Sequence, residues 1–201
     1  ARGGEFDATL TALLRQNVRI PDTFMGDLNA QVAACKVGIK RLEDLLERHG
    51  AAFLAQVCEN LLDRSEAMTR AALREIPDGS YGYVDYLDND GIDLDQRIRI
   101  EVNATIAGDS VHFDLSGTSS QVTGPMNCVP SGSLAAACFA LRAITDPSIP
   151  GNGGCFRPIR LTLPEGSLVN PREPAPVNAR TATIKRITGC MLGALAQAVP
   201  D

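Results

Sequence analysis

The sequence predicts an α+β fold, in which a long antiparallel helical hairpin precedes an antiparallel β-sheet with additional packed helices and long Gly/Pro-rich loops. Three observations support this class. Apolar residues recur at spacings of three and four over much of the first 75 residues. The apolar period then changes to two, as in half-buried strands. Glycines and prolines finally accumulate between residues 114 and 180 and disfavour regular structure there. We therefore expect a helical segment, 1–75, and an α+β segment, 76–201.

The helical segment begins with a short amphipathic pattern over residues 6–15, and Pro21 separates this pattern from the next helix. The apolar stripe of that next helix has heptad-like spacing and consists of Leu28, Val32, Cys35, Ile39, Leu42 and Leu46. Gly50 suits the left-handed position that follows a helix end. A second helix is expected over residues 51–74. Because so few residues separate the two helices, we expect them to fold back as an antiparallel pair.

The α+β segment contains three stretches in which apolar and polar residues alternate, and they predict strands over residues 81–87, 98–106 and 110–115. Between the first two lies Asp88-Asn-Asp-Gly91. We interpret this motif as a hairpin turn, since it lacks the remaining ligand positions of an EF-hand calcium loop. Three later elements are expected: a buried helix over 134–145, a short strand over 159–163 and an amphipathic helix over 183–199.

Composition and charge argue against a nucleic-acid-binding protein and against a membrane-spanning one. The chain is 44% hydrophobic and 21% charged, with a net charge of −5, whereas a nucleic-acid-binding protein usually carries a basic face. No apolar run reaches the roughly 18 residues that a membrane span needs, and the first residues do not resemble a signal peptide, so we expect a cytoplasmic protein. The six cysteines show no metal-finger spacing and are interpreted as buried or half-buried thiols, not as a set of disulfides. The two histidines give no metal motif, and no metal site is expected.

Polar side chains stand among the glycines and prolines of residues 114–180. The candidate substrate-binding residues are Ser116, Thr118, Gln121, Asn127, Asn152, Arg157 and Arg180. The hydroxyl side chains would shape the loops, the amides could bind an amide or carbonyl group, and the arginines could hold a phosphate or carboxylate bidentately. The alternative for each residue, which we favour, is hydrogen bonding between loops, including arginines that satisfy backbone carbonyls.

The sequence alone does not identify the catalytic residues. His112 and Asp114 are the candidates, because side chains two apart in a strand point to the same face and a histidine beside a carboxylate can act as a general base. The other interpretation is a solvated polar face of an antiparallel sheet, which the surrounding alternation favours.

Several long motifs resemble the hydantoinase B/5-oxoprolinase family. They are DLSGTSSQVTGPMNCVPSG, IPGNGGCFRPIRLTLPEGSLVNP and PAPVNAR, preceded in the same order by NVRIPDTFMGDLNAQVAAC, RLEDLLERHG and IPDGSY. The resemblance spans almost the whole chain. It covers a middle portion of longer family members and lacks their upstream His- and Asp-containing stretch, so no catalytic or metal residue of that stretch can be assigned here. We expect the chain to be inactive by itself.

The resemblance implies a function in an ATP-dependent enzyme that opens cyclic amides such as hydantoin or 5-oxoproline. In such enzymes ATP and Mg²⁺ are held by a hydantoinase A-type subunit, which phosphorylates the substrate oxygen, and the B-type subunit completes the hydrolysis. The implied assembly is a hetero-oligomer, and a divalent metal could belong to the family portion absent here. Two alternatives stay open: part of a ketone carboxylase related to acetone carboxylase, or a non-catalytic module that docks subunits through the helical pair.

Overall fold

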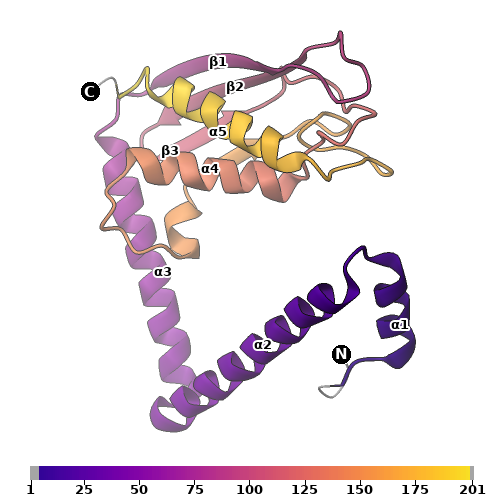
Figure 1. The fold of residues 1–201 in the computed structure, drawn as a ribbon. Helices are drawn as coiled ribbons and strands as arrows, with labels where there is room; N and C mark the ends of the chain where they lie inside the picture. The colour runs from indigo at the N-terminus through magenta and orange to yellow at the C-terminus, as the bar shows by residue number, and fades with distance from the viewer. Residues whose placement is uncertain (1–4, 200–201) are drawn as a thin grey trace. The chain divides into compact units, whose positions relative to one another are not determined.

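The computed structural model describes residues 5–199 and divides the chain into two compact units, 1–58 and 59–201 (Figure 1). The division falls inside a long helix, after Cys58. The predicted domain boundary at residue 75 stays a prediction. None of the helices in the described part of the chain combines the length and the apolar character that crossing a membrane requires.

The first unit is helical, as predicted. Helix α1 (Ala8–Asn17) is capped by Asp7, whose carboxylate accepts a hydrogen bond from the Leu10 backbone N–H at 2.8 Å. Helix α2 (Pro21–His49) begins with its proline in the first turn, where a missing N–H costs nothing. It ends at Gly50, whose φ of 79° lies in the region that glycine tolerates best. Helix α3 (Ala51–Arg74) follows directly.

The apolar stripe of α2 is not buried. Ile39 and Leu42 are 58% and 54% exposed, and Met25 is the only residue of α2 that is buried among the described residues. The two helices and the one-residue break between them confirm the predicted elements. The side chains expected to form the seam of the antiparallel pair, however, contact solvent, so that packing stays a prediction.

The second unit contains a four-stranded sheet in the order β1-β2-β3-β4. The strands are β1 (Gly79–Leu87), β2 (Ile98–Ala107), β3 (Ser110–Asp114) and β4 (Ile159–Thr162). The first three pair antiparallel, and β4 pairs parallel to β3. The sheet is therefore mixed: the predicted antiparallel pairing is confirmed for β1, β2 and β3 and is wrong for β4. The chain returns to the sheet through helix α4, a crossover that permits parallel pairing.

One face of the sheet is covered by α4 (Pro130–Ile144) and α5 (Arg180–Leu195), which lie beside each other (Figure 1). Alternate residues of β2 point into this core, as the period of two predicts: Ile98, Ile100, Val102, Ala104 and Ile106 are all at most 2% exposed. Val111 and Phe113 of β3 join them. The predicted burial of the whole α4 helix is wrong, since Leu134 and Phe139 are 47% and 60% exposed.

The loop between β1 and β2 is longer than the predicted hairpin turn. It runs from residue 88 to residue 97 and is organised by Asp90, whose Oδ1 accepts hydrogen bonds from the backbone N–H groups of Ile92 and Asp93 at 2.8 Å each. An aspartate side chain that accepts hydrogen bonds from backbone N–H groups two and three residues ahead fixes the conformation of a loop. This loop forms one wall of the site described below.

Candidate functional site

The Gly/Pro-rich region is a pair of folded loops that hold each other. The loop that follows β3 and the loop that follows β4 exchange backbone hydrogen bonds, among them Leu168 N–H to the Ser119 carbonyl and Gln121 N–H to the Gly166 carbonyl, both 2.9 Å. Cys128 N–H also donates to the Leu168 carbonyl at 2.7 Å. These bonds satisfy backbone groups that no regular sheet reaches.

Three of the candidate residues hold the start of the first loop. Asp114 accepts hydrogen bonds from the Ser116 backbone N–H at 2.9 Å and from the Ser116 hydroxyl at 2.5 Å. The hydroxyl contact, more than the backbone one, lowers the pKa of Asp114 below its ordinary value. Thr118 is nearly buried and bridges to the backbone of Glu101 in β2, with two contacts of 3.2 Å. The polar groups of these residues are thus used within the chain.

The amides Gln121 and Asn127 also bond to backbone groups. Gln121 accepts from the Arg172 N–H at 2.7 Å and donates to the Arg172 carbonyl at 3.3 Å, which joins the two loops. Asn127 is fully buried, and its Oδ1 accepts from the Val122 N–H at 2.9 Å. Its Nδ2 lies within hydrogen-bonding distance of three carbonyls, those of Val122, Gly124 and Pro176. Asn127 is thus a structural centre of the loop pair.

His112 and Asp114 share a face of β3, as predicted, but no hydrogen bond joins them. The His112 Nε2 lies 2.8 Å from the Thr162 hydroxyl on the neighbouring strand β4. The charge of His112 makes the smallest contribution to the lowered pKa of Asp114. The hydrogen-bonding partner of the His112 ring is therefore the Thr162 hydroxyl and not the Asp114 carboxylate. The catalytic assignment stays a prediction.

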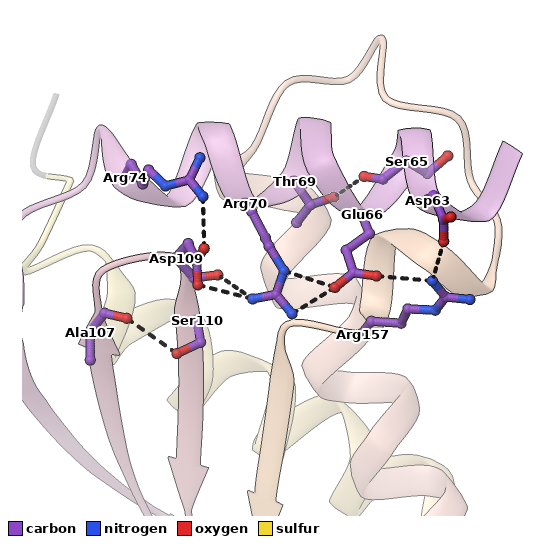
Figure 2. A network of polar contacts seen from close by, with 10 residues as sticks. All are labelled: Asp63, Ser65, Glu66, Thr69, Arg70, Arg74, Ala107, Asp109, Ser110 and Arg157. Atoms are coloured by element: carbon purple, nitrogen blue, oxygen red, sulfur yellow. Dashed lines mark hydrogen bonds and ion pairs between the residues drawn. The ribbon is translucent and has the colours of Figure 1, made fainter. Parts of the chain in front are cut away.

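Arg157 and Asn152 join the loop after α4 to helix α3, and Figure 2 shows the contacts of Arg157. The Asn152 side chain donates to the Ser65 hydroxyl at 2.8 Å and accepts from the Gly154 N–H at 2.9 Å. The Arg157 guanidinium lies 2.8 Å from Asp63 and 2.9 Å from Glu66. Its hydrogen-bond donors are therefore directed at carboxylates of α3.

These contacts belong to a larger network, the α3 charge network, which we define as Asp63, Glu66, Arg70, Arg74, Asp109 and Arg157 (Figure 2). Glu66 lies between Arg157 and Arg70, and hydrogen bonds from both arginines, that from Arg157 first, lower its pKa. Asp109 accepts from Arg70 at 3.0 Å and from Arg74 at 2.7 Å, and these contacts lower its pKa against an opposing effect of burial. The network fastens α3 to the β2–β3 turn and to the loop before β4.

Arg180 lies at the start of α5 and is exposed. It donates to the Val177 carbonyl at 3.2 Å, in the preceding turn. Arg180 and Arg157 thus make separate contacts, with no hydrogen-bonded residue in common. Of the seven candidate substrate-binding residues, only Gln121 borders the polar hollow described next.

A polar hollow of about 340 Å³ lies between residues 90–98 of the β1–β2 loop and residues 119–123 of the first Gly/Pro-rich loop. Its lining includes the side chains of Arg97, Gln96, Ser120 and Thr123, none of which makes a hydrogen bond or ion pair within residues 5–199. Sequence reasoning did not find this site. Its two walls lie about 30 residues apart in the chain, and only the fold brings them together.

The walls of the hollow are fastened to each other. Asp90 is 5% exposed, and its Oδ2 accepts a hydrogen bond from the Gly124 N–H at 2.8 Å, across the two loops. Hydrogen bonds from the N–H groups of Ile92 and Asp93, and then the one from Gly124, lower the pKa of Asp90. A Cβ on Gly124 would lie 2.0 Å from the Asp90 carbonyl oxygen, so the approach of the walls requires glycine.

A second depression of about 330 Å³ lies between α4 and α5, but its lining is almost wholly apolar. Phe139, Ile184 and two alanines form most of it, with Lys185 and Thr188 as the polar side chains. It lacks the convergent polar groups that fix a small ligand. Among residues 5–199, no three His, Cys, Asp or Glu side chains are grouped closely enough to hold a metal ion.

Comparison with known proteins gives one consistent family. The family model described as hydantoinase B/oxoprolinase matches residues 1–201. A putative D-/L-hydantoinase B-type subunit from Pseudomonas sp. (strain NS671) is 37% identical, over 94% of this chain and 33% of that protein. The beta subunit of the caprolactamase of Pseudomonas jessenii is 34% identical, over 94% of this chain and 32% of its own length. The chain therefore spans about a third of the length of these relatives.

Solved structures agree with the sequence comparison. The ATP-dependent caprolactamase from Pseudomonas jessenii matches with a TM-score of 0.90 and 32% identity, over 100% of this chain and 34% of that one. The nucleotide-free structure of an acetone carboxylase matches with a TM-score of 0.77 but only 16% identity, over 88% of this chain and 25% of that one. The second likeness shows a common fold alone.

Proposed function

The chain belongs to the hydantoinase B/oxoprolinase family, and from this we propose that it forms part of the B-type subunit of an ATP-dependent enzyme that opens cyclic amides. The observation that carries the proposal is the match over the full 201 residues, together with the TM-score of 0.90 to an ATP-dependent caprolactamase. Relatives named as hydantoinase, caprolactamase and 5-oxoprolinase all act on cyclic amides, and this is the substrate class we propose.

The proposed reaction uses ATP because an amide is a poor electrophile. Transfer of the γ-phosphoryl group to the amide oxygen yields ADP and makes the ring carbon open to attack by water. Hydrolysis then breaks the ring C–N bond and releases phosphate, so that one cyclic amide, one ATP and two waters give one ring-opened amino acid or carbamoyl acid, ADP and phosphate. We assign the phosphorylation, with its ATP and Mg²⁺, to an A-type partner and the hydrolytic step to the B-type subunit.

The residues of this chain would serve the enzyme by shaping a rigid surface. The two Gly/Pro-rich loops are cross-bonded through Gln121 and Asn127, and rigid loops hold binding groups in place without an entropy cost at each turnover. Ser116, Thr118, Asn152, Arg157 and Arg180 remain candidates for substrate binding. The internal contacts of the first four favour a positioning role in the loops that surround the substrate.

The test is a reconstitution of the full-length B-type protein with its A-type partner. Caprolactam, hydantoin and 5-oxoproline are supplied in turn, and release of the ring-opened acid is measured beside ADP. We expect ring opening of at least one of them that requires ATP and both proteins. ATP consumption that requires bicarbonate and a ketone would identify a carboxylase instead. A complex that assembles but acts on neither class would leave the docking module as the remaining interpretation.

A further inference from the structure

We propose that the polar hollow between residues 90–98 and residues 119–123 binds the carboxylate of a small amino acid or carbamoyl acid, with Arg97 as the group that recognises it. The choice of ligand class rests on the proposed function, because opening a cyclic amide produces such an acid. The hollow itself is argued from its own geometry. Its volume of about 340 Å³ is at the lower end of the range of roughly 300–1,000 Å³ for ligand pockets, which suits a small molecule.

The first step of the argument is the state of Arg97. Its guanidinium carbon lies 5.1 Å from the centre of the Tyr86 ring, a stacking distance at which the aromatic face holds the cation. A guanidinium can contact an aromatic ring with its face while the N–H groups along its edge stay available. Arg97 makes no ion pair or hydrogen bond with any residue between 5 and 199, in contrast to Arg157. The Arg97 guanidinium is therefore held in place by Tyr86, and its N–H donors have no acceptor within the described residues.

The second step is the rigidity of the surrounding walls. Asp90 ties the two walls together through Gly124, and the Ser119 N–H donates to the Arg99 carbonyl at 2.9 Å. The Ser119 hydroxyl in turn accepts from the Arg99 N–H at 2.9 Å. Arg97 is therefore two residues from a position in β2 that is fixed to the opposite wall. Preorganised donors bind a ligand with less loss of freedom than mobile ones.

The third step is charge, which selects among anions. The hollow holds one cation, Arg97, and two carboxylates, Asp90 and Asp93. Asp90 already accepts three backbone hydrogen bonds, whereas Asp93 is exposed and accepts one weak contact of 3.3 Å from the Asp95 N–H. A dianion without an N–H donor, such as phosphate or a simple dicarboxylate, would be repelled by Asp93. An acid that also carries an amino or amide N–H can donate to Asp93 while its carboxylate pairs with Arg97.

The experiment titrates the complete isotope-labelled chain with 6-aminohexanoate and follows the Arg97 Nε–H and the backbone amides of residues 119–123 by NMR. We expect saturable shifts confined to the hollow, weaker binding of adipate, which has two carboxylates, and no saturation by hexylamine, which has none. Arg97→Ala should weaken binding by roughly tenfold or more, the loss expected for a charge-assisted pair. Arg97→Lys should fall between, because lysine keeps the charge but not the fork.

Arg160→Ala is the matched control, since Arg160 is, like Arg97, an exposed arginine of the same unit, but it lies on β4 and does not line the hollow. It should bind as the unchanged chain does. Shifts outside the hollow, no saturable shift, or equal binding by Arg97→Ala with a native spectrum would each overturn the proposal. Binding at the hollow without ring opening by the reconstituted enzyme would overturn only the proposed function. Ring opening without binding at the hollow would overturn only this inference.

Discussion

Two arginines in the same unit, Arg157 and Arg97, have opposite surroundings. Arg157 is 38% exposed and has its donors directed at Asp63 and Glu66 of α3, inside a network that continues to Asp109. Arg97 lies on the rim of a polar hollow, stacked on Tyr86 and without an acceptor in the described chain. The comparison separates two uses of polar residues: paired groups fasten segments of this fold together, and a held but unpaired group is available to a ligand.

The largest loss of stability is expected where the loop that contains Arg157 approaches the backbone of α3 most closely. A Cβ on Gly154 would lie 2.0 Å from the Leu62 carbonyl oxygen of α3, and backbone atoms cannot yield as a side chain can. We expect Gly154→Ala to lower the free energy of unfolding by about 3 kcal/mol. Chemical denaturation measures this change.

Gly153→Ala is the control for that substitution. The nearest atom to a Cβ there is a methyl carbon of Leu62 at 3.7 Å, an ordinary contact. The neighbouring glycine should therefore tolerate alanine with little change in stability. Equal destabilisation by both variants would contradict the assignment to a close backbone approach.

The next largest loss of stability is expected from removing the buried amide of Asn127, which bonds to Val122 in the wall of the hollow. Asn127→Ala would leave the Val122 N–H and the carbonyls of Val122, Gly124 and Pro176 without their side-chain partner. Unpaired buried groups cost roughly 1–3 kcal/mol, and we expect Asn127→Ala to destabilise by about 2 kcal/mol. Hydrogen exchange should quicken in residues 119–128 before it does so in β2. Uniform acceleration over the whole sheet would count against a local role.

A smaller effect is expected at Glu66, and it depends on pH. The folded protein lowers the pKa of Glu66 from its ordinary value of 4.5, chiefly through the hydrogen bond from Arg157. A lowered pKa adds stability that is complete above the ordinary value and is lost as the pH falls through the folded value. Glu66→Gln should therefore unfold at a lower temperature than the unchanged chain at pH 7.

The difference between the two proteins should shrink as the pH falls below 4.5, since the carboxylate of the unchanged chain then takes up its proton. Thermal unfolding between pH 7 and pH 3 measures this convergence. Glu165→Gln is a suitable comparison, because Glu165 is 69% exposed and, within residues 5–199, forms an ion pair with Arg172 alone. A gap that stayed constant with pH would exclude the ionised form of Glu66 as the source of the stability.

The smallest change in stability is expected at Arg97, and it tests the contrast between Arg97 and Arg157 directly. Arg97→Ala should leave the free energy of unfolding within about 0.5 kcal/mol of its original value, as surface substitutions generally do. Arg157→Ala should lower the unfolding temperature, because it leaves Asp63 without this cation and leaves Glu66 with Arg70 alone. If Arg97→Ala destabilised the chain as much as Arg157→Ala, the two arginines would share a structural role and the distinction between the regions would fail.

Much of the fold was predictable because local patterns decide it. The alternation in β2 and β3 identified the buried residues correctly, since side chains two apart in a strand share a face. The candidate residues were less predictable. Asn127 and Thr118 carry the same polar groups whether they bind a ligand or a neighbouring loop, and only their partners distinguish the two cases. Arg97 was passed over because it alternates like any residue on the wet face of a strand.

By itself, the sequence determined the helices, the strands and their buried faces, and its long motifs identified the family. These features depend on the spacing of residues within one element, which the order of the chain states directly. Only the tertiary structure decided that β4 pairs parallel to β3, that Arg157 binds the carboxylates of α3, and that Asp90 joins Gly124 to close the hollow. Each of these contacts joins residues more than 30 positions apart, and the free energy of packing the whole core, not a local preference, brings them together.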